Sequence, residues 1–262
     1  MHPQRKPAPA ANPSTPASAP AAAASPGIDG RYADLLRRHI DDPDVIHQLG
    51  VFARRMYLSK TLGHFDIYRQ VADLPGDVVE CGVFKGESLL NFARFMEILN
   101  PGDRSKAVIG FDHFQGLRDL TQADGTAEHV GNTEGGWNPA DFAPTLMELI
   151  DLFHADSFVP HKPRIRIVDG DIRQTAPRFA EENPGLRINL LHLDCDLYEP
   201  TLAALQAFYP RLVTGGIVLL DEYGMREWPG ESRAVEEYFD GHPPRIQKLG
   251  WLTAPGGWFV KG

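Results

Sequence analysis

Four acidic side chains directly follow two apolar runs in the second half of the chain. The first run begins at Leu190 and the second covers residues 216–220. Apolar runs without alternation are typical of strands that are buried on both faces of a parallel sheet. The helical stretch 199–212 between them predicts parallel strands, whose carboxyl ends lie on the same edge of the sheet. The acids at these ends are Asp194, Asp196, Asp221 and Glu222.

These four carboxylates predict a cation site. If the two strands are neighbours, the acids lie within about 5–10 Å of one another, because adjacent strands are about 4.8 Å apart. Carboxylates this close repel one another unless a positive charge lies among them. A hard divalent cation with oxygen ligands, Mg²⁺ or a similar ion, meets that need. The alternative is that the acids cap helices and face solvent.

A turn with two glycines follows the first predicted strand, residues 78–81. The pattern Glu80-x-Gly82-x-x-x-Gly86 leads into a predicted helix over 89–99. It differs from the dinucleotide fingerprint, which has three glycines and an acid about 20 residues later. Because glycine has no Cβ, the backbone at these positions can pass close to a ligand. The alternative interpretation is an ordinary strand-to-helix turn.

Two more predicted strands end in acids. The run 107–112 ends in Asp112, and the run 164–168 is followed by Gly170 and Asp171. An acid in the position of Asp112 commonly binds ribose hydroxyls, although strand-end aspartates also form caps and turns. Ligands of open α/β sheets bind outside the carboxyl ends of the strands, where the strand order reverses. Acids at so many strand ends therefore predict a ligand site on this edge.

The alternation of elements predicts the fold. Five strand–helix repeats followed by strands 245–249 and 257–261 favour a doubly wound, mostly parallel α/β sheet of seven strands that ends in a C-terminal antiparallel hairpin. Helical patterns over 28–75 predict an N-terminal helical extension, which forms a lid or an oligomer contact. Residues 1–27 are rich in Ala, Pro and Ser, so we expect a disordered tail before a single domain over 28–262.

Composition excludes several classes of partner. The formal net charge is -9 and no basic stripe accompanies it, which argues against nucleic acid. No apolar stretch reaches the ~20 residues of a membrane span. Cys81 and Cys195 lie at the ends of predicted core strands, so we expect buried thiols in a reducing, cytoplasmic setting.

In the long loop 115–139, His129 and Trp137 either cover a substrate or pack beneath the loop.

Four segments together resemble the macrocin O-methyltransferase family of class I S-adenosylmethionine-dependent methyltransferases, over residues from about 54 to 239. The segments are 76–83, 111–117, 192–198 and 228–235. The resemblance implies a Rossmann-like fold and the use of S-adenosylmethionine and a divalent metal. It also implies a sugar-containing acceptor, either a deoxysugar nucleotide or a glycosylated natural product of antibiotic biosynthesis, and a homo-oligomer.

The resemblance also implies a role for each residue that matches the family pattern. The residues of the S-adenosylmethionine site would be Glu80, Gly82, Gly86, Ser88, Asp112, Gly170 and Asp171. Among them, Asp112 would bind the ribose hydroxyls and Asp171 the adenine amine. The metal ligands would be Asp194, Asp221 and Glu222. Asp196 would be the leading general base, with Asp194 as the second catalytic carboxylate.

The chain departs from the family pattern at two of these positions. The family usually has two aspartates where Asp221 and Glu222 stand, and close relatives often have an aromatic residue in place of Asp171. Among histidines, His192 lies within a strand and is expected to be a satisfied core residue, whereas His113 ranks below Asp196 as a base.

Three other functions remain open on the sequence. The first is metal-dependent methylation of a catechol or other phenol. The second is a dinucleotide-dependent oxidoreductase or epimerase, which the glycine spacing disfavours. The third is a non-catalytic nucleotide-binding module.

Overall fold

The computed structural model describes residues 27–125 and 133–262. The chain divides into two compact units, and the boundary in the sequence lies between Ala53 and Arg54. Most of the predicted tail, and His129, lie outside the described residues. The first unit contains helices α1 (Ile28–Arg37) and α2 (Pro43–His47) and the 3-10 helix η1 (Leu49–Phe52). Within the described residues, α1 buries none of its side chains.

The second unit is built on a six-stranded sheet with the order β3-β2-β1-β4-β5-β6. The first five strands of the chain are parallel, and β6 runs antiparallel to β5. The strand order reverses between β1 and β4, where such sheets bind their ligands. The strands are β1 (Asp77–Cys81), β2 (Val108–Asp112), β3 (Ile165–Asp169), β4 (Ile188–Leu193), β5 (Leu212–Leu220) and β6 (Gly257–Val260).

The sheet has one strand fewer than the sequence predicts. The stretch 245–249 forms a single antiparallel bridge, between Gln247 and Trp258, instead of a strand. Two prolines precede this stretch and have no N–H group to donate, and a turn begins at Leu249, whose carbonyl accepts from Leu252 N. The predicted hairpin is therefore reduced to this bridge, and the antiparallel ladder lies between β5 and β6.

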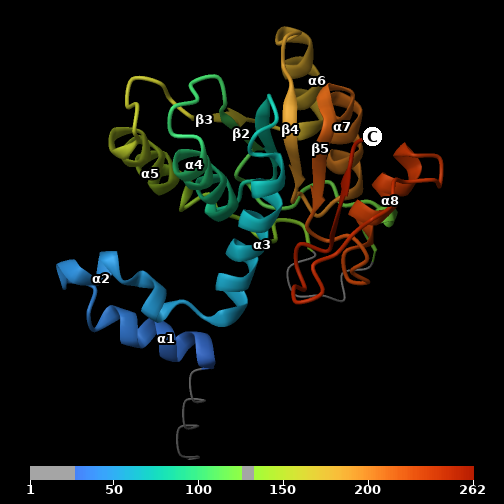
Figure 1. Cartoon of the computed structure of the whole chain (residues 1–262). Coiled ribbons are helices and arrows are strands. Elements are labelled where there is room, and N and C mark those ends of the chain that lie inside the picture. The colour runs from blue at the N-terminus through green and yellow to red at the C-terminus, as the bar shows by residue number, and fades with distance from the viewer. Residues whose placement is uncertain (1–26, 126–132) are drawn as a thin grey trace, which may run out of the picture. The chain divides into compact units, whose positions relative to one another are not determined.

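Helices cover both faces of the sheet (Figure 1). One face packs on α3 (Arg55–Val71), α4 (Glu87–Leu99) and α5 (Ala143–Asp156), and the other on α6 (Ile172–Glu182), α7 (Tyr198–Phe208) and α8 (Pro229–Tyr238). Successive strand residues point to opposite faces, so Val78 packs in the first layer and Val79 in the second. Helix α7 is shorter than predicted, because a 3-10 turn follows Phe208 and β5 begins at Leu212. Two short 3-10 helices complete the unit, η2 (Gln122–Asp124) and η3 (Tyr209–Arg211).

The register of the strands brings their carboxyl ends level. Cys81 pairs with Leu193 across β1 and β4, and Leu193 pairs with Leu220 across β4 and β5. The residues that follow these three positions therefore lie side by side, and they include Asp194 and Asp221. The sequence assumed that β4 and β5 are neighbours, and the sheet confirms it.

The prediction of buried thiols is confirmed. Cys81 and Cys195 are buried free thiols. Among the helices of residues 27–125 and 133–262, none has the length and apolar character to cross a membrane.

Helix α3 also places two polar side chains at the carboxyl ends of the strands. Ile67, Tyr68 and Val71 are buried on its inner face. Lys60 and His64 continue this stripe at helical spacing, and both line the cavity described below.

Candidate active site

A cavity of about 410 Å³ opens at the carboxyl ends of β1, β2, β4 and β5. Its volume is in the range of small-molecule sites. All four acids on which the sequence prediction rests line it, and they are Asp194, Asp196, Asp221 and Glu222. The predicted convergence of acidic strand ends is therefore present in the folded chain.

Three of these acids form a cluster with the geometry of a cation site. Asp194, Asp221 and Glu222 each offer an oxygen, and these atoms lie within 4.8 Å of one another. Asp221 and Glu222 are only 3% and 7% exposed. Oδ1 of Asp221 and Oε2 of Glu222 are buried without a hydrogen-bond partner among the described residues. Buried oxygens without partners are costly, and a hard divalent cation would satisfy them, so this set fits Mg²⁺ or a similar ion.

Lys60 lies within this acid cluster, which the sequence analysis did not predict. Its Nζ is 2.8 Å from Oδ2 of Asp221 and 3.4 Å from Oδ2 of Asp194. Burial opposes its charge, but the carboxylates of Asp194 and Asp221 outweigh burial and raise the pKa of Lys60. Where it lies among these acids, the amine is therefore in its charged form.

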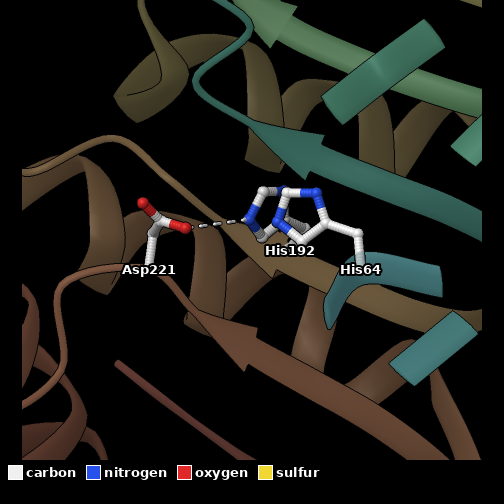
Figure 2. Close-up of side chains that lie close together, drawn as sticks. All are labelled: His64, His192 and Asp221. Carbon is white, nitrogen blue, oxygen red and sulfur yellow. Dashed lines mark ion pairs between the residues drawn. The ribbon is translucent and has the colours of Figure 1, made fainter. Parts of the chain in front are cut away.

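His192 lies in β4 and is fully buried, with its ring beside Asp221 (Figure 2). Its Nδ1 is 3.2 Å from Oε1 of Glu80, and its Nε2 is 3.9 Å from Oδ1 of Asp221. Burial lowers its pKa, but Asp221 and Glu80 outweigh that effect and raise the pKa to about 10. The prediction of a core histidine is confirmed, but the prediction that it is satisfied is wrong for Nε2, which has no hydrogen-bond partner in the described chain.

His64 stands beside His192, with 5.2 Å between the ring centroids. Neither of its ring nitrogens has a hydrogen-bond partner among the described residues, and burial lowers its pKa. His64, His192 and Asp221 also offer ligand atoms within 4.8 Å of one another. Asp221 therefore belongs both to the oxygen-ligand cluster and to a group with imidazole nitrogens.

Glu231 supports the end of β5 from the first turn of α8 and is fully buried. Its carboxyl oxygens accept hydrogen bonds from the backbone N–H groups of Asp221 and Glu222, at 3.2 Å and 3.1 Å. Burial and the charge of Asp221 raise its pKa. Residues 228–235 resemble a family motif, but neither the helix nor this role of Glu231 was predicted, because the sequence position of a single acid does not indicate which backbone groups it contacts.

Asp196 has a strained backbone. Its φ is +61°, and the N–H of Leu197 donates to the carbonyl of Cys195 across it at 2.6 Å, which closes a three-residue turn. Turns of this kind are rare and strained, and strained backbone clusters at functional sites. Burial and the charges of Asp194 and Asp221 raise the pKa of Asp196 to about 8. Burial and Asp221 likewise raise the pKa of Asp194, to about 6.

Gly82 lines the cavity at the end of β1, with φ at +90°. A Cβ at this position would overlap the carbonyl oxygen of Asp194. The close approach that requires glycine is thus to the end of β4, and it places the turn against the acid cluster. Gly86, with φ at +82°, caps α4 behind the cavity, where a Cβ would meet the Leu146 side chain.

Asp112 lines the cavity and organises the glycine turn. Its Oδ2 accepts from the N–H groups of Val83 and Phe84, each at 2.8 Å, and its Oδ1 accepts from Phe114 N at 2.7 Å. Oδ2 thus accepts two hydrogen bonds and Oδ1 only one, so Oδ1 keeps a free lone pair. The side chain therefore has capacity to bind a ribose hydroxyl while it fixes the turn.

Glu80 and Ser88 lie on opposite sides of the cavity wall. Ser88 lines the cavity, whereas Glu80 is fully buried behind it and accepts a hydrogen bond from the Ser88 hydroxyl. Glu80 also pairs with His192, so its described contacts are with the protein.

Asp171 lines the cavity and is held by Arg173. The guanidinium donates to Asp171 through Nε and Nη2, at 2.9 Å and 2.6 Å, and lowers its pKa. Arg173 also binds Asp119 and Glu199 at the rim of the cavity. Gly170 precedes Asp171 at φ +131° and does not line the cavity among the described residues.

Trp137 and His113 both line the cavity. Trp137 is 53% exposed and packs edge-on against Phe84, with 5.8 Å between the ring centroids, so it borders the cavity and is not buried beneath the loop. His113 Nδ1 accepts from Gln115 N at 3.1 Å, which occupies that nitrogen.

Comparisons with known proteins agree on one family. The family model described as Macrocin-O-methyltransferase (TylF) matches residues 38–248. The mycinamicin III 3''-O-methyltransferase of Micromonospora griseorubida is 27% identical over 237 residues, which cover 80% of this chain and 89% of that protein.

Two further relatives are similar. A Streptomyces olivaceus 4'-O-methyltransferase of 8-demethyl-8-(2,3-dimethoxy-alpha-L-rhamnosyl)-tetracenomycin C is 30% identical over 58% of this chain and 54% of that protein. The crystal structure of the calicheamicin methyltransferase CalS11 is 31% identical, with a TM-score of 0.81 over 89% of this chain and 91% of that one. An apo structure of CalS11, described as a TDP-rhamnose 3'-O-methyltransferase, covers 89% of this chain and 93% of its own at 31% identity, with a TM-score of 0.73.

Proposed function

Because the chain belongs to the macrocin O-methyltransferase family, and is therefore an S-adenosylmethionine-dependent O-methyltransferase, we propose that it methylates a sugar hydroxyl with the help of a divalent cation. The observation that carries the proposal is the convergence of Asp194, Asp221 and Glu222, with unpartnered buried oxygens, in the cavity.

The relatives support a sugar as the acceptor. The tetracenomycin enzyme is described as acting on a rhamnosyl group and CalS11 on TDP-rhamnose, and the mycinamicin enzyme methylates a 3''-hydroxyl. We therefore propose a nucleotide-linked deoxysugar or a glycosylated natural product of antibiotic biosynthesis as the acceptor. The bordering rings of Phe84 and Trp137 offer an apolar surface for such a substrate.

The S-adenosylmethionine site is proposed for the β1 and β2 side of the cavity. Gly82, Ser88, Asp112 and Asp171 line it, with Asp112 assigned to the ribose and Asp171 to the adenine amine. Glu80, Gly86 and Gly170 support this wall from behind. A strand-end acid next to a tight glycine turn is a common arrangement for adenine nucleosides.

The chemistry requires a better nucleophile and a base. When bound, the cation lowers the pKa of the sugar hydroxyl, and S-adenosylmethionine supplies an electrophilic methyl group. Asp196 accepts the hydroxyl proton, and its raised pKa suits a base that works near neutral pH. Asp194, Asp221 and Glu222 would hold the cation that positions the acceptor hydroxyl. Glu231 fixes the backbone of Asp221 and Glu222.

We also propose a homo-oligomer with α1 as a contact element. Ile28, Tyr32 and Leu35 are exposed apolar side chains on this helix, and a helix that buries none of its apolar side chains commonly meets a partner.

The acceptor class is tested by incubating the enzyme and labelled S-adenosylmethionine with a panel of deoxysugar nucleotides, glycosides and catechols. We expect methyl transfer to at least one sugar and none to the catechols, with omission of the enzyme as the blank. Transfer to catechols alone would replace the sugar with a phenol.

A further inference from the structure

The Lys60 ammonium lies between two of the carboxylates that are assigned to the metal. It contacts Oδ2 of both Asp194 and Asp221, at 3.4 Å and 2.8 Å. These two residues also belong to the oxygen cluster whose ligand atoms lie within 4.8 Å of one another. A divalent cation held by the same carboxylates would lie within a few ångströms of the ammonium, and like charges at that separation repel strongly where burial limits screening.

The Lys60 side chain can also move away from the acids. It is on the helix α3 surface that lines the cavity, and its side chain is 28% exposed. A lysine carries its charge on a flexible four-carbon stem, so the ammonium can swing into the cavity without movement of the helix. Asp221, by contrast, is held at its backbone by Glu231, so the acids stay in place when the lysine leaves.

From these contacts we propose that Lys60 is an internal counter-cation, which neutralises the acid cluster in the metal-free enzyme and is displaced when a divalent cation binds. This inference rests on the metal role proposed above. Lys60 thereby weakens metal binding, and in exchange it prevents repulsion among Asp194, Asp221 and Glu222 while the metal is absent. A residue that only supported the metal site would strengthen metal binding, so its removal would lower the affinity for the metal.

The test is calorimetric titration of Mn²⁺ into the purified, chelator-treated enzyme and into the Lys60→Met variant. Methionine has a similar length and no charge. We expect the variant to bind Mn²⁺ about 10-fold more tightly or better, since tenfold corresponds to about 1.4 kcal/mol of removed competition. Mn²⁺ should also raise the melting temperature of the variant more than that of the wild type, because the metal-free variant has unbalanced carboxylates.

Two matched variants separate the local effect from general electrostatics. Lys162→Met removes the same charge from an exposed loop position and should leave Mn²⁺ affinity within about twofold of the wild type. Lys60→Arg keeps a positive charge at the site and should show no gain in affinity.

A second measurement uses the wild-type enzyme alone, in case Lys60→Met does not fold. Mass spectrometry after brief acylation of lysines should show that Mn²⁺ increases the modification of Lys60 but not that of Lys162. Unchanged or weaker Mn²⁺ binding by Lys60→Met, with EDTA-sensitive turnover intact, would overturn the role of Lys60 alone. Absence of Mn²⁺ binding by wild type and variant together would overturn the proposed metal site and, with it, this role.

Discussion

Replacing Asp196 with Asn is expected to lower kcat at least about 100-fold, because a positioned general base contributes about that much or more. The amide cannot accept the proton of the sugar hydroxyl. Asparagine tolerates positive φ as aspartate does, so the turn at φ +61° is kept. Initial rates with saturating acceptor, together with calorimetric binding of S-adenosylmethionine, measure the two effects separately. Cofactor affinity should remain within about twofold.

The pH dependence of kcat/KM provides a second readout. A base accepts a proton only when it is deprotonated, so the rate rises with pH up to the pKa of Asp196, which is about 8 in the metal-free protein. A bound cation stabilises the carboxylate and moves this rise to lower pH. The Asp196→Asn variant should lack the rise.

Asp194→Asn is the matched control for this prediction. Asp194 is assigned to the metal, so its amide variant should lose Mn²⁺ affinity, whereas Asp196→Asn should retain it. Near-normal kcat for Asp196→Asn would contradict the assignment and move the base to Asp194 or His113, both of which line the cavity.

Gly82→Ala is expected to destabilise the fold by more than about 4 kcal/mol, or to prevent recovery of folded protein. The added Cβ would overlap the Asp194 carbonyl oxygen, which belongs to the backbone and cannot rotate away. Alanine would also have to adopt φ +90°. Urea denaturation, followed by S-adenosylmethionine binding on any folded fraction, measures the loss.

Gly241→Ala separates strain from overlap. Gly241 has φ +75°, and a Cβ there meets no atom within 4 Å. This variant should lose only about 1–2 kcal/mol, the cost of a left-handed conformation for a residue with a Cβ. If Gly82→Ala were as stable as Gly241→Ala, the close packing of the β1 turn on the end of β4 would be wrong.

The sequence was sufficient to predict the edge of the sheet on which the site lies. The uninterrupted apolar runs before Asp194 and Asp221 reflect burial on both faces, and parallel strands bring their ends together. Because Asp194 and Asp221 directly follow β4 and β5, the register of the sheet positions them without any knowledge of side-chain packing, and Asp196 and Glu222 lie one or two residues further along. This explains why all four acids were predicted to converge.

The same reasoning could not predict the contacts that the covering helices make with this edge. Lys60 reaches acids 134 and 161 positions away, and Glu231 meets the backbone of β5. Such contacts depend on how the helices dock, which the periodicity of a helix does not determine. His64 had one usable signal, since it continues the apolar stripe of α3, but a polar residue on such a stripe indicates burial and not a partner.

The prediction of a seventh strand was wrong for a local reason. The residues 245–249 have the composition of a strand, yet the two prolines before them and the turn at Leu249 leave room for one bridge. The role of Gly82 likewise needed the structure, because glycine in a turn indicates a close approach but not whether a ligand or the chain itself approaches.

The most direct test of the proposed function is the rate of methyl transfer to the sugar acceptor after EDTA treatment and again after addition of Mg²⁺. If Asp194, Asp221 and Glu222 hold the cation that activates the hydroxyl, EDTA should reduce turnover by about two orders of magnitude, and Mg²⁺ should restore it. S-adenosylmethionine binding should be little changed in either state. Turnover that is indifferent to EDTA would contradict the metal role of these three acids.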